Sequence, residues 1–277
     1  MSRKETFSAD WLQQREPFDS AARNGAAGRM QLLSRLTPPQ GSPWRVIDLA
    51  CGTGANLRWL APRLGGPQQW LMVDHDAALL RRIPWDFSGA GFQASTVRQQ
   101  TDLARQLDTL PWHAAHLVTA SALLDLVSAE WLQRLVAHAI AARAALLFAL
   151  SVDGRHQWTP QDPHDATVDR LFRAHQRRDK GFGPALGADA IAACRRALRA
   201  AGYRVFTTSS DWVLDGHEQP QAAALQRALI GGMAAAAREQ DPASQATLQA
   251  WCERRQAAVA DSRLRVGHVD LLALPPH

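Results

Sequence analysis

The residues with the clearest chemical pattern lie in the segment VIDLACGTGANL, residues 46–57. Gly52 and Gly54 follow an apolar stretch that is typical of a strand and precede a stretch that is typical of a helix. At such a turn the missing Cβ of glycine lets a ligand approach the backbone closely. Asp48 lies inside the same segment. The pattern therefore predicts a binding loop for a nucleotide-like ligand rather than a plain turn.

A second acid follows at the spacing that nucleotide-binding α/β folds use. Asp74 ends the apolar stretch QWLMVD and lies twenty residues after Gly54. A carboxylate at this position can accept hydrogen bonds from both hydroxyls of a ribose. Asp76 competes for this role, but its place before a helical stretch is better explained as an N-cap.

The loop fits neither of two common phosphate-binding motifs. A dinucleotide fingerprint needs a third small residue where this chain has Leu57, and a phosphate loop needs a Gly-Lys pair that the segment lacks. The segment instead resembles motif I of the class I methyltransferases, D/E-x-G-x-G-x-G, with Ala50 in place of the first glycine. This resemblance covers about residues 44–152. It implies that the chain binds S-adenosylmethionine, transfers its methyl group and releases S-adenosylhomocysteine.

The resemblance also implies roles for single residues. The loop after the first strand would hold the methionine part of the cofactor, Asp74 the ribose, and His75 would lie against the adenine. Asp102 would bind the adenine amino group, although a helix N-cap explains it equally well. The complete set of cofactor-binding residues that we predict is Asp48, Ala50, Cys51, Gly52, Gly54, Asn56, Asp74, His75, Asp102, Leu103, Ala120 and Ser121.

Candidates for the acceptor side lie outside this loop. Methyl transfer from a sulfonium is an in-line displacement, so positioning supplies most of the acceleration and a base only adds to it. His175 is the first candidate for a base, although it shares a helical face with apolar residues, as a packed histidine would. Asp125, one helical turn after Ser121, could contact the acceptor or cap a helix. The further residues that we expect near the acceptor are Asp19, Arg23, Asp153, Arg178, Lys180 and Phe182.

Simpler explanations stay open for several of these residues. Asp19 and Arg23 are four residues apart and could form an ordinary ion pair on one helix. Arg178 and Lys180 could be solvated charges.

The elements that would position these residues alternate as in a parallel sheet covered by helices. The predicted strands are 44–50, 69–74, 92–99, 115–121, 145–152, 203–214 and 263–274. The predicted helices are 55–64, 76–83, 101–108, 129–143 with Ser128 as N-cap, 167–179, 189–201 and two within 219–262. Residues 152–165 are predicted as a polar loop. This order indicates an α/β fold, and the resemblance implies a Rossmann-like, doubly wound, mostly parallel sheet of seven strands.

We expect residues 1–277 to form a single domain, with its additions gathered into a cap. Its predicted parts are an amino-terminal helical cap (1–43), the cofactor-binding core (44–152), helical insertions over the acceptor site (153–202 and 215–262) and the last two strands (203–214 and 263–274).

Composition restricts the partners. The formal net charge is +5 and the pI is about 9.8, but the basic residues are spread along the chain and are almost all arginine. Such usage indicates a GC-rich coding bias rather than a phosphate-binding surface. The arginines in alanine-rich helical stretches are expected on solvated faces: Arg195, Arg196, Arg199, Arg254 and Arg255.

The cysteines and the apolar stretches place the protein in a cytoplasmic setting. Cys51, Cys194 and Cys252 are scattered and odd in number, which predicts reduced thiols rather than disulfides. His156 and His164 lack a paired acid motif, so we predict no metal. We expect no signal peptide and no membrane span, since no stretch approaches about 20 uncharged apolar residues.

The leading interpretation is O- or N-methylation of a small molecule in a lidded pocket, by a monomer or a homodimer. An RNA methyltransferase is the first alternative, motivated by the pI. The segment TASA after the fourth predicted strand lacks the N/D-P-P-Y/F motif of enzymes that methylate base amines, and it argues against those classes. Nucleic acid is not the expected partner. The second alternative is a protein that binds the cofactor without transferring its methyl group.

Overall fold

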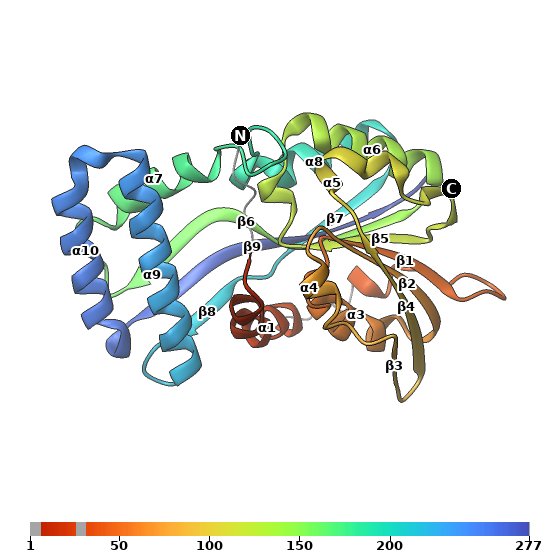
Figure 1. The fold of residues 1–277 in the computed structure, drawn as a ribbon, viewed down its shortest axis with the longest axis horizontal. Coiled ribbons are helices and arrows are strands. Elements are labelled where there is room, and N and C mark those ends of the chain that lie inside the picture. Colours follow the sequence, from red (N-terminus) through yellow and green to blue (C-terminus); the bar gives the residue numbers. More distant parts are fainter. Residues whose placement is uncertain (1–6, 26–31, 277) are drawn as a thin grey trace.

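The computed structural model describes residues 7–25 and 32–276, which form one sheet with helices on both faces (Figure 1). Across these residues the sheet has nine strands in the order β3-β4-β2-β1-β5-β6-β9-β7, and β8 also pairs with β9. The Rossmann-like α/β prediction is confirmed, with nine strands rather than seven. Part of the predicted amino-terminal cap, residues 1–6 and 26–31, lies outside the described residues.

Five strands run parallel and bring their carboxyl ends to one edge of the sheet. The parallel pairs are β4 with β2, β2 with β1, β1 with β5 and β5 with β6. The other four strands each run antiparallel to a neighbour. The bounds are β1 (Trp44–Leu49), β2 (Gly66–Asp74), β3 (Asp86–Gly89), β4 (Phe92–Gln100), β5 (Leu117–Ser121), β6 (Ala145–Thr159), β7 (Arg204–Ser209), β8 (Trp212–Asp215) and β9 (Arg263–Leu274).

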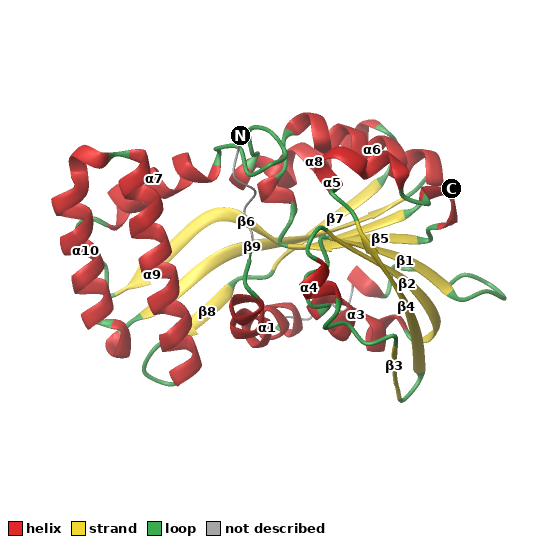
Figure 2. Cartoon of the chain, in the orientation of Figure 1, coloured by secondary structure: helices red, strands yellow, loops and turns green. Residues whose placement is uncertain are grey.

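The helices divide between the two faces of the sheet, as Figure 2 shows. Helices α5, α6 and α8 cover one face, and α1, α3 and α4 lie on the other. The bounds are α1 (Ala9–Asn24), α3 (Ala55–Leu64), α4 (Ala77–Leu80), α5 (Leu103–Gln106), α6 (Ala129–Ala142), α7 (Asp165–Gln176), α8 (Ala190–Ala200), α9 (Pro220–Gln240) and α10 (Gln245–Ala257).

Local capping signals set several helix starts where the sequence predicts them. Ser128 accepts a hydrogen bond from the Trp131 amide at 3.2 Å, and Asp76 accepts one from the Ala78 amide at 2.7 Å. Asp102 likewise caps α5. A side-chain oxygen that accepts an otherwise unpaired amide at a helix start stabilises the helix by about 1 kcal/mol.

Strand β6 is longer than predicted, because the first part of the expected polar loop 152–165 pairs with β9. Their register shifts twice, between Phe148 and Ser151 and between Val152 and His156. Leu150 and Gly154 have positive φ angles of 55° and 82° at these irregularities. Bulges of this kind bend a strand and re-aim its side chains. The alternation of side chains breaks at each bulge, which hides the strand from a search for regular periodicity.

The predicted strand 203–214 is two strands, since Ser210 and Asp211 interrupt it between β7 and β8. Both parts pair with β9. The short β3 was not predicted and forms a hairpin with β4 at the edge of the sheet.

Helices α7, α9 and α10 form a lobe over the extended ends of β6, β8 and β9 (Figure 1). Their apolar faces share a core that includes Trp158, Trp212 and Trp251. The two predicted helices within 219–262 are confirmed, with their break after Gln240.

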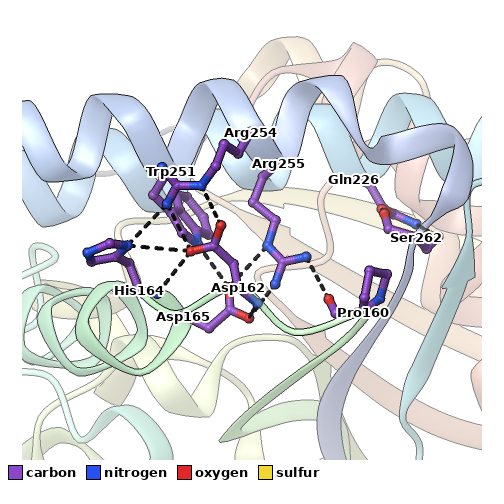
Figure 3. Close-up of polar contacts among 9 residues, drawn as sticks. All are labelled: Pro160, Asp162, His164, Asp165, Gln226, Trp251, Arg254, Arg255 and Ser262. Atoms are coloured by element: carbon purple, nitrogen blue, oxygen red, sulfur yellow. Dashed lines mark hydrogen bonds and ion pairs between the residues drawn. The ribbon is translucent and has the colours of Figure 1, made fainter.

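A buried ion pair fastens α10 to the first residue of α7 (Figure 3). Arg255 is 3% exposed and forms an ion pair with Asp165, which also accepts the indole N–H of Trp251 at 2.9 Å. Its neighbour Arg254 is more exposed and pairs with Asp162 through an Nε to Oδ2 distance of 2.7 Å. The prediction of a solvated face is therefore wrong for Arg255, because the carboxylate of Asp165 lies inside the lobe. It holds for Arg195, Arg196 and Arg199, which are exposed.

Candidate functional site

A pocket opens at the carboxyl ends of β1, β2, β4 and β5, with α1 and residues 180–182 beside it. It encloses about 1120 Å³, including space open to solvent. Parallel sheets bind ligands at this edge. Thirteen of the predicted site residues line it: Asp19, Asp48, Ala50, Cys51, Gly52, Asn56, Asp74, His75, Asp102, Leu103, Ser121, Lys180 and Phe182.

The turn between β1 and α3 needs left-handed backbone at three positions. The φ angles are 50° at Ala50, 55° at Gly52 and 82° at Gly54. A Cβ on Gly52 would lie 3.0 Å from Leu12 Cδ1 of α1, so glycine also gives α1 room to approach. Ala50 adopts a left-handed conformation that L residues avoid and glycine does not, which explains why glycine is the residue expected there.

Asp74 holds this turn in place. Its Oδ2 accepts the backbone N–H of Gly52 at 2.8 Å, and its Oδ1 accepts that of Asp76 at 2.9 Å. The Nδ1 of His75 lies 3.3 Å from the same Oδ1. Each carboxylate oxygen has a second lone pair, so Asp74 can still accept hydrogen bonds from a ligand in the pocket.

Asp48 is completely buried at the inner end of the pocket. Its Oδ1 accepts the side-chain amide of Asn56 at 2.9 Å, and the same amide reaches Thr119 Oγ1 at 3.1 Å. Its Oδ2 has no hydrogen-bond partner within the described residues. Burial raises the pKa of Asp48 to about 7, against the opposing effects of the Asn56 hydrogen bond and the charge of Arg23.

Helix α1 lies against the glycine turn and is fastened to α3. Glu16 accepts two hydrogen bonds of 2.6 Å from Arg58. Asn24 accepts the indole N–H of Trp59 at 2.9 Å. These contacts join segments separated by more than thirty residues, and they make α1 one wall of the pocket.

Arg15 was missed by the sequence analysis, although it lines the pocket. Its Nε donates to Asp19 Oδ2 at 2.9 Å, and its guanidinium lies 4.9 Å from the centre of the Trp212 ring. Asp19 also accepts the indole N–H of Trp212 at 3.0 Å. The expected pair of Asp19 with Arg23 is thus replaced by a pair with Arg15. Arg15 lies four residues before Asp19, just as Arg23 lies four residues after it, and this spacing could have predicted the pair.

Residues 180–182 bring a polar and an aromatic side chain to the pocket. Asp179 accepts the backbone N–H groups of Gly181 at 2.7 Å and Gly183 at 3.0 Å, which shapes the loop. Phe182 meets Trp131 edge to face with ring centres 5.3 Å apart. Lys180 and Phe182 both line the pocket, as the sequence analysis expects.

The structure does not bring His175 to this pocket. Its Nε2 lies 3.1 Å from Glu239 on α9, and Arg178 next to it bonds to Glu239 and Gln240. His175 is on α7 and Arg178 follows its end, and both contact the last turn of α9, while Val168 and Leu171 of α7 pack into the core of the lobe. Support for His175 as a base is therefore lost.

The remaining predicted residues also lie outside the lining of the pocket. Asp153 pairs with Arg155, and Asp125 lies in a short 3-10 turn next to Leu126, which does reach the pocket. Gly54 caps α3, and Ala120 packs inside β5. Arg23 is buried behind Asn56 and lines a smaller cavity.

The helices 215–262 do not cover the pocket, contrary to the predicted cap. No residue after Phe182 lines it within the described part of the chain. Helices α9 and α10 are occupied by the core of their own lobe.

Among residues 7–25 and 32–276, no helix has the length and apolar character to cross a bilayer. The same residues contain no group of three or more His, Cys, Asp or Glu side chains arranged to hold a metal ion. The three cysteines are free.

Comparison with known proteins identifies the segment that carries the glycine turn. A family model described as a methyltransferase domain matches residues 46–144. No curated protein sequence matches the chain.

Solved structures with a similar arrangement are distant in sequence. A cyclopropane-fatty-acyl-phospholipid synthase-like protein from Lactobacillus casei is 12% identical with a TM-score of 0.51, over 97% of this chain and 94% of its own, and shows a shared fold. Phospholethanolamine N-methyltransferase 2 from Haemonchus contortus is 12% identical with a TM-score of 0.45. The match covers 98% of this chain but only 59% of that protein. A SAM-dependent methyltransferase from Archaeoglobus fulgidus is 12% identical with a TM-score of 0.44, over 97% of this chain and 100% of its own.

Proposed function

We propose that this chain methylates a small molecule in the pocket beside α1. The premise is that it is a class I S-adenosylmethionine-dependent methyltransferase, because residues 46–144 match a methyltransferase domain. The observation that supports a small acceptor is the position of α1. Leu12 closes on the glycine turn, and the ion pair of Glu16 with Arg58 fixes the helix there. A wall so close to the turn narrows the space that an acceptor can enter.

The residues of the pocket fit the cofactor. The unpartnered Oδ2 of buried Asp48 offers an acceptor for the ammonium group, and the absent Cβ of Gly52 leaves room beside the turn. Asp74 keeps lone pairs for the ribose hydroxyls, and Asp102, which lines the same pocket, would accept a hydrogen bond from the adenine amino group. When bound, the cofactor supplies a methyl group on a sulfonium, which a nucleophile can displace in line.

The chain's own residues would mainly orient the acceptor. Leu12, Leu126 and Phe182 give the pocket apolar surface, and Arg15 contributes a cation held by Asp19. Holding two reactants in line accounts for a large part of the barrier reduction in such a displacement. We propose that Asp19 and Arg15 orient the acceptor, with Lys180 on the opposite loop.

Two measurements test this function. Calorimetry should detect binding of S-adenosylhomocysteine to the full chain, and methyl-labelled S-adenosylmethionine should label a low-molecular-weight product in a metabolite extract. Labelling confined to added RNA, together with RNA affinity that falls steeply with salt, would favour the RNA alternative. Binding without any labelled product would favour a cofactor-binding protein that transfers nothing.

We also propose that the enzyme acts in the cytoplasm, which agrees with its free cysteines. A fluorescent fusion of the full chain that localises elsewhere would contradict this. Light scattering of the purified protein distinguishes a homodimer from a monomer.

A further inference from the structure

A buried chain of polar contacts connects α1 with Asp48. Arg23, which is 3% exposed, donates from its NH1 to Asn56 Oδ1 at 2.9 Å. The amide nitrogen of Asn56 then donates to Asp48 Oδ1 at 2.9 Å. Asn56 therefore links the cation on one side to the carboxyl group on the other, and it leaves Asp48 Oδ2 for the pocket.

Arg23 is an expensive residue to bury for packing alone. Its guanidinium lies 3.7 Å from the centre of the Trp59 ring, and its Nε has no hydrogen-bond partner. Its ion-pair partner is Asp270, whose Oδ2 lies 4.0 Å from Nε, beyond hydrogen-bonding distance. A buried pair at this separation offsets only part of the cost of removing both charges from water. The charges of Asp19 and Asp48 also favour the charged form of Arg23, so its guanidinium in turn acts on these carboxyl groups.

We propose that Arg23 is a positioning residue of the cofactor site. Through Asn56 it orients the carboxyl group of Asp48, and its charge favours the ionised form, so that Oδ2 can accept a hydrogen bond from the ammonium group of the cofactor's methionine part. This inference rests on the proposed function, since it assumes that the pocket binds that group.

The proposed role predicts that ligand binding releases a proton. Burial raises the pKa of Asp48 to about 7, so near neutral pH part of the ligand-free protein carries a proton on this group. An ammonium group at Oδ2 favours the ionised form, and the proton leaves to solvent. The groups that face Asp48 or Arg23 from the surrounding elements are Asp19, Cys51, Asn56, Arg63, Asp74, Thr119 and Asp270.

The test measures the affinity for S-adenosylhomocysteine by calorimetry between about pH 5 and 9. In the wild-type chain the affinity should fall as the pH decreases below about 7, approaching tenfold per pH unit. Arg23→Gln removes the charge and also shortens the side chain, and without the charge the midpoint of this pH profile should move upward by about one unit. Arg23→Lys restores the charge and should return the midpoint toward the wild-type value.

Asp48→Asn supplies the matched control. This variant should bind S-adenosylhomocysteine weakly and with no pH dependence in the same range, and it should release no proton when the heat is measured in buffers of different ionisation enthalpy. An Arg23→Gln variant that loses affinity by the same factor at every pH, with the midpoint of the pH profile unchanged, would show a merely structural role. That result would overturn the inference.

The pH dependence of stability, measured without ligand, distinguishes the proposed role of Arg23 from the proposed function. Since the pKa of Asp48 rises from 3.8 to about 7 on folding, the folded chain holds a proton in that range that the unfolded chain has lost. The Asp48 contribution to stability therefore falls as pH rises between these values, and Arg23→Gln should extend the fall to higher pH. Failure of the wild-type chain to bind S-adenosylhomocysteine at any pH contradicts the proposed function. An unshifted stability profile contradicts only the role of Arg23.

Discussion

Asp74 Oδ2 accepts the backbone N–H of Gly52 at 2.8 Å, so the acid at the end of β2 fixes the glycine turn at the end of β1. The two strands are neighbours in the sheet, with Leu49 opposite Val73. A residue expected to bind a ligand thus also shapes the loop that binds it. Substitutions at Asp74 must separate these two effects.

Asp74→Ala and Asp74→Asn make that separation. Asp74→Ala leaves the buried N–H of Gly52 without an acceptor, which should lower the free energy of unfolding by about 1 to 3 kcal/mol. Asp74→Asn keeps one acceptor oxygen, for the N–H of Gly52, and loses the acceptor for the N–H of Asp76, so it should be less destabilised than Asp74→Ala. Its affinity for S-adenosylhomocysteine should still fall about tenfold, because hydrogen bonds to a charged acceptor are the stronger ones. Unchanged affinity in Asp74→Asn would contradict the proposed contact with the ribose.

Ala50 carries backbone strain that glycine would relieve. Its φ of 50° lies in the left-handed region, which costs an L residue about 1 to 2 kcal/mol. Glycine loses about 0.5 to 1 kcal/mol more backbone entropy on folding. Ala50→Gly should therefore raise the free energy of unfolding slightly, by up to about 1 kcal/mol, in denaturant titrations. Ala193→Gly, inside α8, is the control and should destabilise by about 1 kcal/mol. A destabilised Ala50→Gly variant would show that the turn is not strained.

The glycine turn and its surroundings are predictable from sequence because their signals are local. Strand β1, the turn and α3 follow from the spacing of apolar residues and glycines over residues 44–64, and the observed α3 has the predicted bounds. Asp76 and Asp102 start their helices through amides two residues away. Such short-range contacts leave a pattern within a few residues of sequence.

The walls of the pocket and the helical lobe depend on contacts that leave no local pattern. Glu16 meets Arg58 across 42 residues, and Asp165 meets Arg255 across 90. Nothing near Arg255 in sequence distinguishes it from exposed Arg254. The position of α9 and α10 follows from the length of β6 and β9, and the bulges at Leu150 and Gly154 conceal that length.

Arg254 and Arg255 are a natural pair of test positions for the lobe. Arg255→Met leaves the carboxylate of Asp165 without its cation inside the lobe, which should cost about 3 kcal/mol of unfolding free energy. Arg254→Met breaks a more exposed pair and should cost at most about 1 kcal/mol. Urea titrations of both variants provide the comparison. Equal losses would mean that burial of Arg255 does not decide the strength of its ion pair.

His175 should be dispensable for methyl transfer. It pairs with Glu239, whose side chain is 66% exposed, and it lies outside the pocket lining. His175→Gln should therefore keep the wild-type rate with labelled S-adenosylmethionine and lose less than about 1 kcal/mol of stability. Asp19→Asn is the matched variant on the pocket side, and it should lower the rate because Asp19 orients Arg15. The opposite pattern, with His175→Gln folded but inactive and its pH–rate profile altered, would restore the histidine as a base and place the acceptor next to α7.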